Sequence, residues 1–141
     1  EIGVRLVGSE MCIRDRGKEY RSVDVGIMIE TPSAVFISDI LAKEVKFFSI
    51  GTNDLTGYTM AVDRGNAKVE NLYDVFQPSV LRAIETTIKN AKKAGIQVGM
   101  CGEAAADTKL IPYLIKWGLD EFSVSPGSIL QTRKTICEYD R

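Results

Sequence analysis

Short apolar runs alternate with stretches of helical periodicity along most of the chain. Apolar runs at residues 25–29, 47–51, 96–100 and 119–124 are typical of strands. The first of these runs is continuous and predicts a strand buried on both faces. After each run, apolar residues recur every three or four positions, which predicts a helix. The pattern therefore predicts four strand–helix units in succession.

Capping signals mark where the predicted helices begin and end. Thr31 and Pro32 are typical of an N-cap and a first helical position, and Pro78 opens a second helix that Gly95 ends. A third helix begins near Asp107 and is closed by a glycine at 118. The first helix runs to about residue 45, and Pro112 delays or kinks the start of the third. Each predicted helix has one apolar face that we expect to be buried. These faces are Val35, Phe36, Ile40 and Leu41 in the first helix; Leu81, Ile84, Ile88 and Ala91 in the second; Leu110, Ile111, Leu114 and Ile115 in the third; and Ile129, Leu130, Arg133, Ile136 and Cys137 in the last. Residues 54–71 form a long polar connection.

Alternating strand–helix units imply parallel strands joined by right-handed crossovers, and hence an α/β fold. Four such units form either a small open sheet or half of an eight-stranded barrel, which typically needs ~250 residues. Polar side chains follow three of the four predicted strands at the same pole. That clustering favours the barrel, because barrel enzymes carry their chemistry at the C-terminal ends of strands.

Bulk composition narrows the class of protein. The chain has 141 residues, 45% of them hydrophobic and 26% charged, with a net charge of -1. This balance is ordinary for a globular protein and favours neither nucleic acid nor an anionic membrane as a partner. No apolar run approaches the ~20 residues of a membrane span. The three cysteines favour a reducing, cytoplasmic compartment over a disulfide framework, and histidine is absent.

Residues 1–16 do not follow the pattern of the rest. Their last eight residues, SEMCIRDR, show neither strand nor helix periodicity and carry four charges. We interpret residues 1–16 as a sequencing or gene-calling artefact, with a charged helix end or loop as the alternative. The domain is expected to comprise residues 17–141.

Three polar residues at predicted strand ends are candidate oxygen ligands. Glu30 ends the first strand, and Asn53 and Asp54 follow the second. Each has an ordinary structural explanation, because acids favour helix N-termini and asparagine favours turns. Two carboxylates from consecutive parallel strands nevertheless lie at one pole, and Mg²⁺ prefers a few carboxylates with substrate phosphate and water.

Arg64 and Cys101 are the remaining candidates. Arg64 lies ten residues after Asp54 and could return to the site to bind a phosphate or carboxylate, although arginine is more often a surface charge. Cys101 lies in the segment GMCGE, where flanking glycines allow close approach at a strand end. A buried cysteine is usually a small hydrophobic residue, and we interpret Cys12 and Cys137 as inert.

Five blocks in order resemble the phosphoenolpyruvate-utilising enzymes: GIMIETPSA, FFSIGTNDLTGYTMAVDRGN, PSVLRAI, VGMCGEAAAD and GLDEFSVSPGSI. The AVDRGN segment is most similar to the phosphoenolpyruvate–protein phosphotransferases, the enzyme I family of the bacterial sugar phosphotransferase system. The resemblance covers about residues 17–141 and implies the C-terminal half of a (β/α)8 TIM barrel. It also implies that Glu30 and Asp54 bind Mg²⁺, that Asp54 contributes to substrate binding as well, that Asn53 and Arg64 hold the substrate phosphate, and that Cys101 protonates the enolate carbon.

The resemblance implies phosphoryl transfer from phosphoenolpyruvate to a histidine on a separate domain and then to the carrier protein HPr, releasing pyruvate. A homodimer is expected, and the chain alone is expected to be inactive because it lacks histidine and the first half of the barrel. Gly57 and Ala106 depart from the family pattern of Gln and Gly but are none of the named ligands. The alternatives are part of a pyruvate phosphate dikinase or phosphoenolpyruvate synthase, or a non-catalytic half-barrel module.

Overall fold

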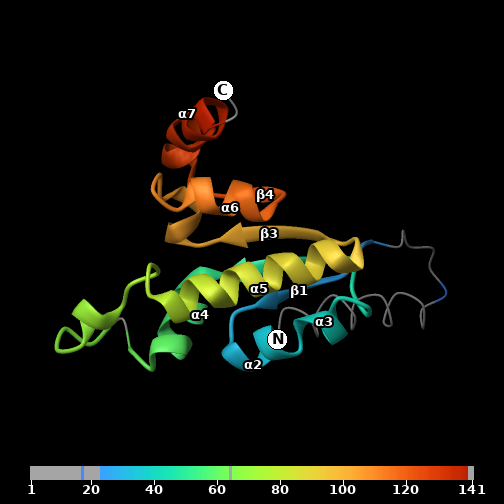
Figure 1. The fold of residues 1–141 in the computed structure, drawn as a ribbon, viewed down its shortest axis with the longest axis horizontal. Coiled ribbons are helices and arrows are strands. Elements are labelled where there is room, and N and C mark those ends of the chain that lie inside the picture. Colours follow the sequence, from blue (N-terminus) through green and yellow to red (C-terminus); the bar gives the residue numbers. More distant parts are fainter. Residues whose placement is uncertain (1–16, 18–22, 64, 140–141) are drawn as a thin grey trace.

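The computed structural model describes residues 17, 23–63 and 65–139, which form one parallel sheet with helices between its strands (Figure 1). The strands are β1 (Gly26–Ile29), β2 (Phe47–Gly51), β3 (Gln97–Cys101) and β4 (Glu121–Ser123). The helices are α2 (Pro32–Phe36), α3 (Ser38–Leu41), α4 (Thr52–Met60), α5 (Pro78–Ala94), α6 (Ile111–Trp117) and α7 (Ile129–Tyr139), with 3-10 turns η1 (Glu70–Leu72), η2 (Glu103–Ala106) and η3 (Pro126–Ser128).

The strands lie in the sheet in the order in which they occur along the chain. β1 pairs with β2, β2 with β3 and β3 with β4, and every pair is parallel. A doubly wound sheet would reverse its strand order at a switch point, and the described strands have none. Consecutive order with right-handed crossovers places all connecting helices on one face. The predicted α/β fold is therefore confirmed, and its topology is that of part of a barrel.

The two faces of the sheet differ in burial. Phe48, Ile50, Val98 and Met100 point to one face, are fully buried, and form the core with apolar residues of the helices. Residues at the alternate positions point to the other face, which we call the open face. There Met28 is 48% exposed. The prediction that the first strand is buried on both faces is thus wrong for this part of the molecule, since the helices cover only one side.

Several predicted helix boundaries are confirmed. The Thr31 hydroxyl accepts a hydrogen bond from the Ala34 amide at 3.2 Å, as an N-cap does. Gly95 and Gly118 end α5 and α6 in the left-handed conformation. Pro112 occupies the first turn of α6, so this helix begins at Ile111 rather than near residue 107.

The first and last helices differ from their predicted stripes. The first is broken at Ile37 into α2 and α3, and Phe36, the last residue of α2, is 84% exposed. In α7, Leu130 is 79% exposed and Thr132 is buried instead. Spacing alone thus identified the helices but assigned part of each buried face wrongly, although Val35 and Leu41 do pack in the core as predicted. The predicted polar connection at 54–71 also begins inside a helix that was not predicted, α4.

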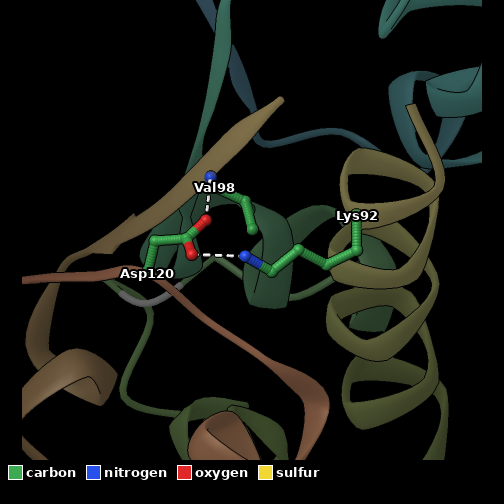
Figure 2. A network of polar contacts seen from close by, with 3 residues as sticks. All are labelled: Lys92, Val98 and Asp120. Carbon is green, nitrogen blue, oxygen red and sulfur yellow. Dashed lines mark hydrogen bonds and ion pairs between the residues drawn. The ribbon is translucent and has the colours of Figure 1, made fainter. Parts of the chain in front are cut away.

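One polar network fastens the second half of the sheet to α5 (Figure 2). The Asp120 carboxylate pairs with the Lys92 ammonium group of α5 and accepts a hydrogen bond from the Val98 amide of β3 at 2.9 Å. The Asp120 amide in turn donates to the Val98 carbonyl at 2.9 Å. These contacts fix where β4 begins relative to β3.

Two predictions concern residues that the structure does not describe. The proposed artefact at residues 1–16, and with it Cys12, lies outside the described residues, so the boundary at residue 17 stays a prediction.

Within the described part of the chain, no helix combines the length and apolar character that crossing a bilayer would require.

Candidate functional site

The C-terminal ends of β1, β2 and β3 bring four of the five predicted site residues to one edge of the sheet. Glu30 directly follows β1, Asn53 and Asp54 lie in the first turn of α4 after β2, and Cys101 is the last residue of β3. Because the strands are parallel, these ends share one pole. Arg64 lies outside the described residues, so its predicted place at the site is not described.

Glu30 lies against the end of the neighbouring strand. A Cβ atom added at Gly51 would lie 3.0 Å from Oε2 of Glu30 and 2.9 Å from the sulfur of Met28. The Glu30 carboxylate can lean toward β2 only because residue 51 has no side chain. Gly51 therefore shapes the space between the first two units.

Asn53 and Asp54 line a depression of ≈ 480 Å³ beside α4. Asp63 and Tyr73 line it as well, so the segment that follows α4 returns to the first turn of that helix. The Tyr73 hydroxyl donates a hydrogen bond to the Asn53 carbonyl at 2.9 Å. This bond holds the returning segment against the first turn of α4, next to the two predicted ligands.

Cys101 is a half-buried free thiol on the open face. Its sulfur donates to the carbonyl of Ile50 at 3.6 Å and accepts from the hydroxyl of Ser49 at 3.8 Å. Both partners belong to β2, so the thiol is held across the junction of two strands. Cys137, by contrast, is exposed on α7, far along the chain from this edge.

The loop after β3 depends on a glycine with positive φ. Gly102 has φ 98 and ψ 179, a region that is essentially restricted to glycine. A Cβ atom there would lie 2.4 Å from the Thr52 hydroxyl oxygen and 3.1 Å from Oδ1 of Asn53. Thr52 is 1% exposed and donates to the Cys101 carbonyl at 2.8 Å, and Oδ1 of Asn53 accepts from the Glu103 amide at 3.4 Å. These bonds fix the backbone that carries both Asn53 and Cys101.

Sequence reasoning missed three residues that shape this edge: Ser49, Thr52 and Tyr73. Ser49 lies in an apolar run and Thr52 in a polar cluster, and no sequence pattern distinguished either residue from its neighbours. Tyr73 lies twenty residues from its partner, and no local pattern predicts such a contact. The glycine after Cys101 was the one visible signal, since glycine at a strand end indicates close approach.

The donor chemistry of this edge fits a magnesium ion. Glu30 and Asp54 offer carboxylate oxygens from neighbouring strand–helix units, and Mg²⁺ is usually bound by one or two carboxylates together with substrate and water. Among the described residues, no group of three or more His, Cys, Asp or Glu side chains forms a protein-only metal cage. A pair of carboxylates suits an ion whose remaining ligands are substrate and water.

Comparison with known proteins defines the class. Residues 7–141 match the family described as "PEP-utilising enzyme, PEP-binding domain", and the chain belongs to this family.

Within the family, the chain is similar to phosphoenolpyruvate-protein phosphotransferases of several bacteria. It is 55% identical over 118 residues to the protein of Streptococcus equinus, a match that covers 84% of this chain and 20% of that protein. It is 51% identical over 120 residues to the protein of Listeria monocytogenes, covering 85% of this chain and 21% of that protein. It is 52% identical over 119 residues to that of Bacillus subtilis, covering 84% and 21%. The chain thus spans about a fifth of the length of these relatives.

Proposed function

We propose that this chain supplies the phosphoenolpyruvate site of a phosphoenolpyruvate–protein phosphotransferase. The reaction moves the phosphoryl group of phosphoenolpyruvate to a histidine and then to the carrier protein HPr, and it leaves pyruvate. The observation that carries the proposal is the thiol of Cys101 at the same pole as two carboxylates and an amide, in a chain of this family. A proton donor beside magnesium ligands is what conversion of an enolate to pyruvate needs.

Glu30 and Asp54 are the proposed ligands of Mg²⁺. A bound Mg²⁺ would supply positive charge that offsets the negative charge of the substrate during phosphoryl transfer. The leaning of Glu30 over Gly51 supports this role, because it brings that carboxylate toward the unit that carries Asp54. Neither carboxylate has an ion-pair partner among the described residues.

Asn53 and Arg64 are the proposed phosphate ligands. With its Oδ1 accepting from the Glu103 amide, the side chain of Asn53 keeps its amide nitrogen available as a donor to a phosphate oxygen. Arg64 would add a bidentate guanidinium contact, which suits phosphate geometry. Cys101 would then give its proton to the carbon of the pyruvate enolate.

The remaining parts of the reaction belong to other protein segments. The 141 residues contain no histidine, so the phosphoryl acceptor must come from elsewhere, as must contact with HPr. We propose that the chain alone is inactive, that the complete protein is a cytoplasmic homodimer, and that its activity requires Mg²⁺.

A hybrid protein tests the proposal. Residues 17–141 replace the matching fifth of the Streptococcus equinus relative, and pyruvate formation is followed with phosphoenolpyruvate, HPr and Mg²⁺. We expect the hybrid to form pyruvate, the isolated chain to form none, and Cys101→Ala to lower the rate at least about a hundredfold, at the lower end of acid–base contributions. Cys137→Ala, on the exposed cysteine, is the matched control and should retain the full rate.

The metal assignment has its own test in the same hybrid. Glu30→Gln and Asp54→Asn keep the shape of the side chains but remove their charge, so the Mg²⁺ concentration for half-maximal rate should rise at least about tenfold. An unchanged Mg²⁺ dependence in both variants would refute the assignment. An inactive hybrid that is folded would refute the proposed function.

A further inference from the structure

Ser49 is the one described side chain whose hydroxyl contacts the Cys101 sulfur. It lies in β2 on the open face, where its strand neighbours in register are Met28 and Gly99. Gly99 has no side chain, so nothing from β3 at this level stands between Ser49 and Cys101, two residues further along β3. The Ser49 Oγ donates to Sγ at 3.8 Å, and this is its only side-chain hydrogen bond among the described residues.

We propose that Ser49 is a positioning residue for the Cys101 thiol and that its hydroxyl stabilises the thiolate left by proton transfer; this inference rests on the proposed function. In that step the S–H bond breaks and a C–H bond forms with the electron pair of the enolate. The electron pair of the S–H bond stays on sulfur as negative charge, and solvent later restores the proton. The Ser49 hydroxyl hydrogen-bonds to the sulfur throughout.

The two contacts of the sulfur differ in how they respond to this step. The Ile50 carbonyl can only accept, so its contact with Cys101 exists while the thiol carries its proton. The hydroxyl of Ser49 donates, and hydrogen bonds strengthen when the acceptor becomes charged. Ser49 therefore stabilises the state after proton transfer more than the state before it, which is the condition for accelerating a reaction step.

The position of Ser49 suits this role better than a purely structural one. Its neighbours Phe48 and Ile50 point into the core, whereas Ser49 points to the open face and is half-buried there. Replacing its hydroxyl removes no core packing and no contact with the backbone. A functional effect of such a change would thus be separate from an effect on folding.

The first test uses the chain itself and needs no substrate. Iodoacetamide labels thiolates, and mass spectrometry of peptides reports Cys101 and Cys137 separately in the same molecule. We expect Ser49→Ala to slow labelling of Cys101 at least about threefold relative to Cys137, and Ser49→Thr, which keeps the hydroxyl, to restore it. Ser123→Ala is the matched control, because Ser123 pairs with Cys101 in register on β4 but has no hydrogen bond to the sulfur.

The second test separates proton transfer from phosphoryl transfer in the hybrid protein. Exchange of the pyruvate methyl protons in deuterium oxide, followed by proton nuclear magnetic resonance, reports proton transfer between Cys101 and the substrate carbon without a phosphoryl-transfer step. We expect Ser49→Ala to lower this exchange about tenfold, the lower end for a hydrogen bond to a charged group, while histidine phosphorylation changes less than twofold. Ser49→Thr should recover most of the exchange.

The outcomes distinguish this inference from the function on which it rests. If the hybrid phosphorylates its histidine but Ser49→Ala leaves both labelling and exchange unchanged, the inference is wrong and the proposed function stands. Equal loss of exchange and phosphorylation in Ser49→Ala would also overturn it, because a structural defect affects both steps. If the unsubstituted hybrid neither phosphorylates its histidine nor exchanges the methyl protons of pyruvate, the proposed function is wrong, and so is the role of Ser49 that depends on it.

Discussion

Replacing Gly102 by alanine should destabilise the chain far more than its size change suggests. The residue has φ 98 and ψ 179, and a non-glycine residue in this region costs roughly 1–3 kcal/mol. The new Cβ atom would also lie 2.4 Å from the hydroxyl oxygen of Thr52, which must move. Thr52 is fully buried and donates to the Cys101 carbonyl, so displacing it leaves buried polar groups without partners at about 1–3 kcal/mol. We expect a total loss of about 3–5 kcal/mol.

Urea denaturation followed by circular dichroism measures this loss, and Gly95 provides a matched control. Gly95 has φ 74, but an added Cβ atom there meets nothing within 4 Å. Gly95→Ala therefore carries only the backbone cost of about 1–2 kcal/mol. If Gly102→Ala costs no more than Gly95→Ala, the contact with Thr52 does not constrain the loop, and our account of how Cys101 is held is wrong.

Three further predictions use the same assay. Asp120→Ala should lower the free energy of unfolding by about 1–3 kcal/mol, because the Val98 amide loses its acceptor. Lys92→Gln should lower it by at most about 1 kcal/mol, because the ion pair is partly exposed. Equal losses in the two variants would contradict this ranking. Phe48→Ala should lower the free energy of unfolding by about 3–5 kcal/mol and Phe36→Ala by less than about 0.5 kcal/mol, since only Phe48 is buried. A large loss in Phe36→Ala would mean that the Phe36 side chain is covered in solution. Thr52→Val keeps the side-chain volume but removes the hydroxyl that donates to the Cys101 carbonyl, so it should lower the free energy of unfolding by about 1–2 kcal/mol. An unchanged urea midpoint would contradict this prediction.

The order and type of the main elements could be predicted from sequence because their signals are local. Thr31 with Pro32 marks a helix start, and Gly95 and Gly118 mark helix ends, wherever the helices later pack. The buried face of a short helix is not local information. Phe36 fits the periodic stripe, but it lies on the surface at the end of α2, where the helix breaks at Ile37.

The candidate site shows the same division. The sequence indicated that polar residues follow several strands, and the parallel sheet brings Glu30, Asn53, Asp54 and Cys101 to one pole because of strand direction alone. What lies beside each of these residues depends on strand register. Ser49 contacts the Cys101 sulfur because Ser49 pairs with Gly99 in the register of β2 and β3. The sequence alone does not determine that register, so it could not predict this contact.

The consecutive strand order also bears on how the polypeptide acquires its structure during synthesis. Among the described strands, β2, β3 and β4 each pair with the strand translated immediately before it, so each can join the sheet once its own strand–helix unit has been made. Pairing between neighbours along the chain gives these contacts a smaller sequence separation than pairing between the first and last strands would, and a smaller separation lowers the entropy cost of closing the loop. A nascent chain can therefore extend this sheet unit by unit as it leaves the ribosome.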